Sequence, residues 1–79
     1  MEHESAVQKR SISLGGRKTS ISLEEQFWLA LKEIASDRDV PVRSLVAQID
    51  TGRDRTNLSS ALRVYVLEHY KRLRALEDD

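Results

Sequence analysis

Arg17-Lys18-Thr19-Ser20-Ile21-Ser22-Leu23 runs directly into Glu24-Glu25-Gln26-Phe27-Trp28, and this stretch decides the fold. Its first seven residues alternate polar and apolar side chains, as a half-buried strand does. The acids and aromatic side chains that follow are typical of the start of an amphipathic helix. Ser22 and Glu25 have the spacing of a capping box, so we expect Ser22 to be the helix N-cap. The stretch therefore predicts a strand that passes into a helix without a spacer.

The same alternation occurs upstream of Gly15-Gly16, where Ser11-Ile12-Ser13-Leu14 precedes its repeat at residues 20–23. Because glycine readily adopts positive φ, a Gly-Gly pair between two alternating runs is a hairpin signal. A two-residue turn would pair Leu14 with Arg17, Ile12 with Thr19, and Ser11 with Ser20. The alternatives over residues 10–23 are this hairpin and a single strand that follows an extended arm.

Three helices are expected after the strand, over residues 24–38, 42–50 and 58–76. Pro41 marks the first break, and a polar loop follows Gly52, with Thr56 or Asn57 available to cap the third helix. The first half of that helix is apolar nearly all round, which in a short chain predicts burial against a second copy. Residues 1–8 lack periodicity and are expected to form a flexible arm, which leaves one domain over 9–79. The predicted fold class is mostly α with a short N-terminal β ribbon.

The composition indicates a small cytoplasmic protein completed by oligomerisation. The chain has 79 residues and no cysteine, so disulfides and thiolate metal sites are excluded. No apolar run is long enough to span a membrane, and the acidic start is unlike a signal peptide. Net charge is zero, but the charges are segregated. Acids dominate from Glu24 to Asp50, whereas residues 9–22 hold only bases, namely Lys9, Arg10, Arg17 and Lys18. The alternative explanation of this segregation is a set of solvated loops.

An enzyme is not expected. His3 and His69 form no spaced ligand pair, and neither neighbours the serine or aspartate of a triad. Gly15-Gly16 lacks the further glycines and the lysine of a phosphate loop. We therefore expect no catalytic residues, no metal and no cofactor.

Nucleic-acid binding has a physical basis in the strand. A two-stranded ribbon fits the major groove of B-DNA, and alternate strand residues point to one side. Lys18, Ser20 and Ser22 would then face the bases, with antiparallel pairing to a second copy as the simplest completion. If residues 10–23 form a hairpin, Ser11, Ser13 and Arg10 would widen the reading surface or cover its edge. Trp28 lies in the apolar stripe of the first helix, which is more typical of a core or dimer interface than of a base-stacking platform.

This order of strand, capped helix, turn and second helix resembles the ribbon-helix-helix DNA-binding superfamily, to which the Arc and methionine repressors belong. The resemblance covers Lys18 to Asp50, and the residues that carry it are Thr19 to Glu25, Ala30 to Ala35 and Asp39 to Val46. With Asn57 to Val64 added, the chain is similar to a proteobacterial subgroup of short, stand-alone members. A different register takes Asn57-Leu58-Ser59-Ser60 as the start of the superfamily's second helix and residues 42–50 as an insertion. The register that takes residues 42–50 as the second helix needs no gap in the match to the superfamily, and we favour it for that reason.

The resemblance implies an intertwined homodimer, here with an additional C-terminal helix, that binds double-stranded DNA. Three alternate strand side chains would read bases, which maps onto Lys18, Ser20 and Ser22. The start of the second helix would hold a backbone phosphate, which maps onto Val42, Arg43 and Ser44, with Arg17 as a further backbone contact. Two positions depart from the superfamily pattern, because many members have a small or flexible residue where Asp39 stands and Ser or Thr where Pro41 stands. Pro41 has no N–H to donate, and Asp39 would repel phosphate.

The expected function is a bacterial transcriptional regulator, specifically a repressor at a short inverted repeat, with further assembly of dimers on DNA left open. One alternative is a protein-interaction module or antitoxin-like adaptor that uses its last helix. Another is a homodimeric scaffold that has lost DNA binding, which would agree with zero net charge.

Overall fold

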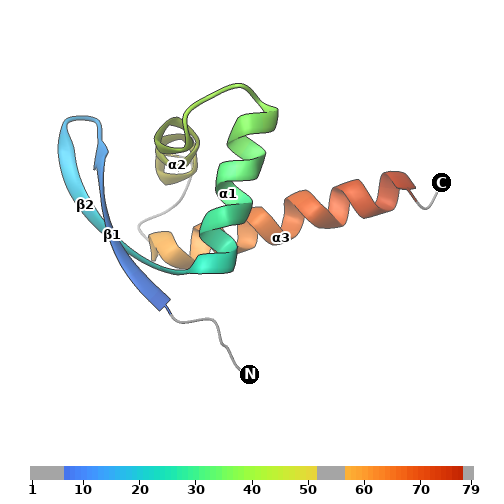
Figure 1. Ribbon diagram of the computed structural model, residues 1–79, viewed down its shortest axis with the longest axis horizontal. Coiled ribbons are helices and arrows are strands. Elements are labelled where there is room, and N and C mark those ends of the chain that lie inside the picture. The colour runs from blue at the N-terminus through green and yellow to red at the C-terminus, as the bar shows by residue number, and fades with distance from the viewer. Residues whose placement is uncertain (1–6, 52–56, 78–79) are drawn as a thin grey trace.

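The computed structural model describes residues 7–51 and 57–77, which form a two-stranded ribbon followed by three helices (Figure 1). The elements are β1 (Val7–Leu14), β2 (Arg17–Glu24), α1 (Glu25–Asp37), α2 (Val42–Thr51) and α3 (Leu58–Glu77). This architecture confirms the predicted fold class. The expected segments at 1–6, 52–56 and 78–79, which include the Gly52 and Thr56 helix ends, lie outside the described residues.

The ribbon is an antiparallel hairpin, as the Gly-Gly turn predicts. Leu14 pairs with Arg17, Ile12 with Thr19, and Ser11 with Ser20. Both glycines have positive φ, 59° at Gly15 and 82° at Gly16, which matches the type I′ turn that two-residue hairpins favour. β1 is longer than predicted, because it begins at Val7 and pairs as far as Glu24. The last residues of the expected N-terminal arm therefore belong to the ribbon.

The predicted capping box at the start of α1 is wrong. β2 continues to Glu24, and Glu24 occupies the N-cap position with extended backbone and no side-chain cap hydrogen bond. Ser22 is paired with Lys9 inside the ribbon, so its backbone is committed to the strand. Leu23 is fully buried on the inner face of the ribbon. The local capping signal is overridden because strand pairing and burial of Leu23 extend the strand past Ser22.

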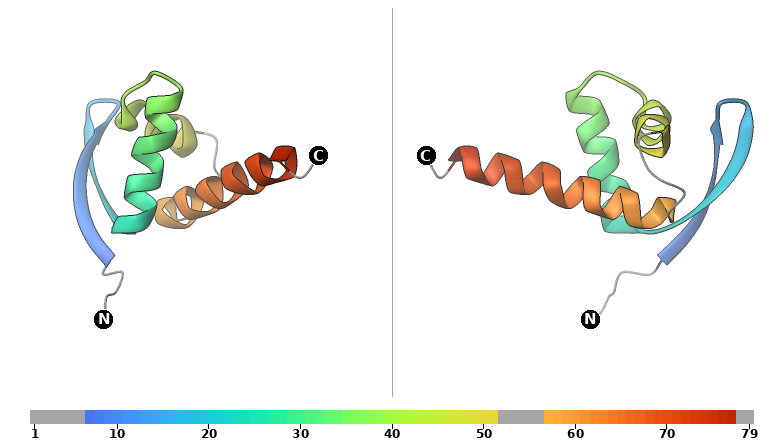
Figure 2. Two further views of the ribbon diagram at one scale, coloured as in Figure 1. Left: turned by 45° about the vertical axis from the view of Figure 1, so that its right-hand side comes forward. Right: turned by 180° about the vertical axis from the view of Figure 1, so that it is seen from behind.

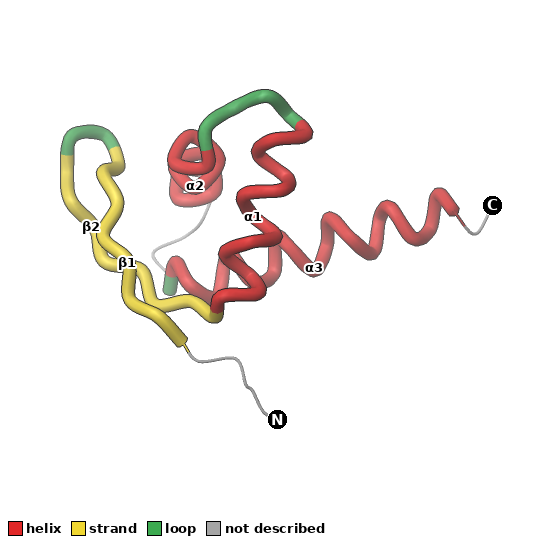
Figure 3. Tube along the Cα trace, viewed as in Figure 1, coloured by secondary structure: helices red, strands yellow, loops and turns green. Residues whose placement is uncertain are grey.

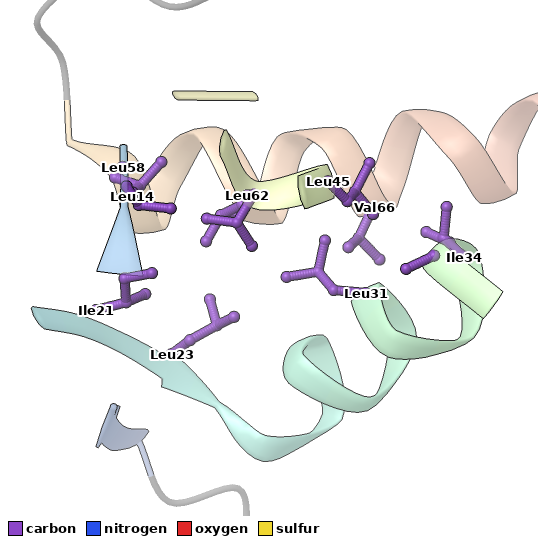
Figure 4. Close-up of a cluster of buried hydrophobic side chains, with 11 residues drawn as sticks. Leu14, Ile21, Leu23, Leu31, Ile34, Leu45, Leu58, Leu62 and Val66 are labelled. Atoms are coloured by element: carbon purple, nitrogen blue, oxygen red, sulfur yellow. The ribbon is translucent and has the colours of Figure 1, made fainter. Parts of the chain in front are cut away.

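The helices cover one face of the ribbon. α2 lies beside the ribbon and α1 follows it, whereas α3 begins next to β2 and extends away from it (Figures 1, 2 and 3). All five elements contribute to one core (Figure 4), whose buried residues are Leu14, Ile21, Leu23, Leu31, Ile34, Ala35, Leu45, Val46, Leu58, Leu62 and Val66. The start of α3 is capped as predicted, since Asn57 Oδ1 accepts hydrogen bonds from the Ser59 and Ser60 amides at 2.8 and 3.3 Å.

A side-chain hydrogen bond also joins α1 to the exposed part of α3. Tyr70 Oη donates to Glu33 Oε1 at 2.7 Å. This bond, together with burial and the nearby carboxylates, raises the pKa of Tyr70 to about 12. The neutral tyrosine is the bonded form, so its contribution to stability is present below the ordinary tyrosine pKa and is lost as pH rises through the raised value.

The turn between α1 and α2 contains a residue in a left-handed conformation. Asp39 has φ 63°; its amide donates to Ser36 O at 3.0 Å, and the Val40 amide donates to Ala35 O at 3.0 Å. These two bonds form a Schellman motif, in which the left-handed position favours glycine.

Asp39→Gly is therefore expected to raise the free energy of unfolding by about 0.5–1 kcal/mol, because glycine adopts this φ without the side-chain clash. Asp37→Gly is a control that removes the same charge from the last residue of α1, where glycine should destabilise the helix. Chemical denaturation of both variants checks the signs. Stabilisation by neither substitution, or by both equally, would contradict the conformational explanation.

Candidate nucleic-acid interface

The outer face of the ribbon consists of short polar and basic side chains. Lys18, Ser20 and Ser22 of β2 are all exposed, and so are their cross-strand partners on β1, Ser13, Ser11 and Lys9. Between these positions the inner face carries Ile21 and Leu23, which are buried in the core. The strand period of two thus separates a solvent face from a core face, as the alternation predicts.

The acid at the end of the ribbon is neutralised by α3. The Arg63 Nε–H donates to Glu24 Oε1 at 2.8 Å. This hydrogen bond and the positive charge hold the pKa of Glu24 below its ordinary value. The ion pair contributes to the stability of the fold at pH values above the ordinary glutamate pKa. This contribution is lost as pH falls through the lowered pKa of Glu24. The Lys and Ser side chains of the outer face therefore lie beside a carboxylate that is already paired.

Arg10 does not belong to this outer face, contrary to the expectation that it widens or edges the reading surface. Its register partner is Ile21, so it points toward the helices. Its guanidinium lies 4.8 Å from the centre of the Trp28 ring and forms an ion pair with Glu25. Trp28 is half-buried against the core. Both side chains attach β1 to α1, which removes them from the set of base-contacting candidates.

The start of α2 lies beside β1. A groove of about 580 Å³ separates them, and it is lined by Arg10, Ser11, Ile12, Ser13, Trp28, Pro41, Val42 and Arg43. The Arg43 side chain is exposed at this groove. Free amides at a helix start attract anions, and the Val42 and Arg43 amides donate to no backbone group among the described residues. The Ser44 amide donates to Pro41 O at 3.0 Å, so only its hydroxyl is available to a ligand.

The structure places the residues singled out from the sequence in separate groups on the ribbon and at the start of α2. Val42 and Arg43 share a groove with the outer strand β1, whereas Lys18, Ser20 and Ser22 lie on β2. Arg17 follows the hairpin turn and is exposed. Sequence reasoning left Lys9 out of the site, because the register that places it opposite Ser22 requires a strand longer than the tetrad predicts.

Residues 7–70 match the sequence profile of the ribbon-helix-helix domain. The chain belongs to the ribbon-helix-helix family. The matched region begins at the first residue of β1 and ends within α3, so the domain includes both strands of the hairpin and all three helices. Comparison with curated proteins and with solved structures gave no significant match.

Membership confirms the resemblance drawn from the strand and the helix start. Ribbon-helix-helix domains are DNA-binding regulators rather than enzymes, and they typically act as dimers. Within residues 7–51 and 57–77, no group of three or more His, Cys, Asp or Glu side chains is placed to hold a metal ion. None of the helices in these ranges is long and apolar enough to cross a membrane.

Proposed function

We propose that this ribbon-helix-helix protein is a sequence-specific DNA-binding transcriptional regulator that represses by occupying a short inverted repeat. The observation that carries the proposal is the outer face of the ribbon, where Lys18, Ser20 and Ser22 are exposed at alternate positions of β2. A ribbon of this width fits the major groove. Lysine can donate to guanine O6 and N7, and serine can donate to or accept from any base.

The backbone contacts of the proposal come from Arg17, Val42, Arg43 and Ser44. Arg43 supplies a positive charge beside the ribbon, and the Val42 and Arg43 amides supply donors at the positive end of the α2 dipole. The Ser44 hydroxyl adds a further donor. Such contacts orient the protein on the duplex, while the ribbon reads the sequence. Asp39 is exposed near the same helix start and lowers the phosphate affinity of this site.

Selection of bound duplexes from a random DNA pool, followed by mobility shifts over a range of salt concentrations, tests the proposal. We expect a preferred sequence with two-fold symmetry, and an affinity that falls as salt rises because bound phosphates release counterions. A protein without duplex affinity at low salt would contradict the proposed function.

We also propose that the active form is a cytoplasmic homodimer. An apolar groove of about 320 Å³ lies between α1 and α3, and it is lined by Phe27, Arg63, Val64, Val66, Leu67 and Tyr70. Val64 and Leu67 are 55% and 56% exposed in the single chain. A domain this small buries little of its surface alone, so a second copy that covers α3 would complete the core. Sedimentation that shows a stable folded monomer would contradict this part.

The exposed apolar side chains of α3 also favour a second candidate function, an adaptor or antitoxin-like module that docks on another protein. In that case α3 would be covered by a partner of different sequence, and duplex affinity would be weak. Purification from the native host distinguishes the two candidate functions. An adaptor would copurify in a fixed ratio with a partner of different sequence, whereas the regulator would be recovered as a complex of two copies of this chain.

A further inference from the structure

The C-terminal half of α3 carries apolar side chains that the described parts of the chain leave exposed. The buried residues of α3 end at Val66, but the helix continues to Glu77 and extends away from the other elements (Figures 1 and 2). Side chains three positions apart are neighbours on a helix surface. The large exposed apolar residues of α3 have this spacing and form one ridge, made of Val64, Leu67, Tyr70, Leu73 and Leu76. A continuous exposed apolar surface indicates a contact site.

The ridge has a hollow half and a projecting half. The apolar groove between α1 and α3 is lined by Phe27 and by residues of α3 from Arg63 to Tyr70. Beyond the groove, Leu73 and Leu76 are 43% and 73% exposed. One copy of α3 therefore presents an apolar groove near the core and apolar knobs near its C-terminal end.

One side of α3 contains both the groove and a knob. At about 100° per residue, Arg63 and Glu77 lie within about 20° of Tyr70 around the helix, and Leu67 and Leu73 lie within about 60° of it. Leu67 and Leu73 are equally far from Tyr70 along the sequence, and so are Arg63 and Glu77. We call this side the Tyr70 face. It has an apolar centre and opposite charges at its two ends.

The charges of the Tyr70 face favour an antiparallel second copy. In an antiparallel pair centred on Tyr70, Leu73 of each copy lies level with Leu67 of the other, at the groove. Glu77 of each copy then lies level with Arg63 of the other, and opposite charges attract. A parallel pair in register would instead place Arg63 against Arg63 and Glu77 against Glu77, where like charges repel.

Two arginines on this side can accommodate the second copy. The Arg63 Nε–H donates to Glu24 Oε1 at 2.8 Å, and a guanidinium has further N–H donors for a second carboxylate. The Arg63 side chain is 34% exposed, so it can be reached. Arg74 also lies on this side and is exposed. Its aliphatic stem can cover apolar surface while its charge stays in water.

The position of the folded core favours the same order. α3 begins in the core and ends away from it (Figure 2). In an antiparallel pair centred on Tyr70, the two cores lie at opposite ends of the paired helices. A parallel pair would bring both cores to the same end, where α1 already contacts this side through the hydrogen bond from Tyr70 to Glu33. A second copy can therefore approach the groove with the free end of its helix.

We propose that α3 pairs antiparallel with α3 of a second copy, so that Leu73 of each chain occupies the α1–α3 groove of the other. This rests on the proposed covering of α3 by a second copy, and it names the segment that covers it. Each copy gives and receives the same knob, so the contact is isologous. Leu73 and Glu77 lie beyond the family match at residues 7–70. The ribbon takes no part in this contact and stays available to DNA and to a further chain.

Sedimentation equilibrium of Leu73→Glu beside Ala75→Glu tests the knob. Both substitutions add a carboxylate at an exposed position, but Ala75 lies about 140° from Tyr70 around the helix, away from the contact. Leu73→Glu should raise the concentration of half-association by about tenfold, as expected for the loss of a central interface side chain. Ala75→Glu should change it by less than about twofold.

Glu77→Lys tests the antiparallel order. It places a lysine level with Arg63 of the second copy, so association should weaken by about two- to fivefold at low salt. The difference should shrink as added salt screens the charges. Glu68→Lys makes the same charge change at an exposed position about 160° from Tyr70 around the helix, and it should leave association unchanged. Equal weakening by both substitutions would be an effect of net charge and would overturn the proposed pairing.

Cross-linking distinguishes the two orders directly. The chain contains no cysteine, so single cysteine variants can be joined by a short thiol-reactive cross-linker. In a mixture of Leu67→Cys and Leu73→Cys proteins, the cross-linker should join one variant to the other more than either protein to itself, because the antiparallel order places these positions level. Efficient cross-linking of each variant only to its own kind would show a parallel pair and overturn the proposal.

The outcomes separate this contact from the proposed homodimer. A wild-type protein that associates, with Leu73→Glu and Glu77→Lys indistinguishable from it, would overturn the α3 contact and leave the homodimer standing. A monomeric wild-type protein would overturn both. Circular dichroism should show wild-type helix content in each variant, because Leu73 and Glu77 are exposed. If Leu73→Glu loses helix content, Leu73→Ala removes the knob without adding a charge and should weaken association in the same direction.

Discussion

Leu62→Ala is expected to lower the free energy of unfolding by about 2–5 kcal/mol, the range for truncating a fully buried leucine. Leu62 has no exposed surface, and it lies among Leu58, Leu45 and Leu31 where three helices meet (Figure 4). A domain of this size has a total stability of only about 4–12 kcal/mol. The loss is therefore large enough to leave the variant largely unfolded at moderate denaturant concentrations.

Leu29→Ala provides the matched control, because the same three carbons are removed from a side chain of α1 that is 51% exposed. Its expected loss is below about 1 kcal/mol, since little apolar surface returns to water. Chemical denaturation at one fixed protein concentration checks both values, which matters because dimerisation makes apparent stability depend on concentration. Equal losses at Leu62 and Leu29 would show that Leu62 does not lie in the core.

Lys18→Ala is expected to reduce affinity for the selected duplex by about 1–3 kcal/mol, roughly 5- to 150-fold, if Lys18 donates to a guanine in the major groove. Specificity at the contacted base pair should be lost with it. The exposed position of Lys18 makes a change in stability small. The measurement is a mobility shift on the selected duplex and on duplexes substituted at each base pair.

Arg43→Ala distinguishes a backbone contact from a base contact. Arg43 is exposed at the start of α2, beside β1. Its loss should weaken binding to all sequences alike and reduce the slope of affinity against salt by about one. A Lys18→Ala variant that behaves in this same uniform way would show that Lys18 contacts phosphate and that specificity comes from elsewhere, such as DNA shape.

Much of the fold follows from local features of the sequence. Gly15-Gly16 between two alternating runs predicts the hairpin and its register, and the apolar periodicity predicts each helix to within a residue at either end. The prediction failed at Ser22, where a capping motif is present but the strand continues to Glu24. The capping motif spans four residues, and it is overridden because the hairpin pairing continues past Ser22, which pairs with Lys9, to Glu24, which pairs with Val7.

The candidate site was predictable in part for the same reason. Alternate positions on a strand share a face whatever the rest of the chain does, so Lys18, Ser20 and Ser22 could be grouped from the sequence. Arg10 and Lys9 could not be assigned in this way. Their roles depend on how far β1 extends and on Trp28 and Glu25 being packed against its inner face.

The opening stretch and its upstream repeat by themselves determined the ribbon, its turn and its two faces, because a period of two and a two-residue turn relate only near neighbours in the chain. The tertiary structure alone decided that α3 covers the far edge of β2 through Ser59 and Arg63, and that the start of α2 lies beside β1. The two contacts of α3 with β2 join residues 37 and 39 positions apart, and all of these contacts exist because one shared core holds the helices against the ribbon. Packing around that core, rather than local propensity, sets where the basic groups lie relative to the ribbon.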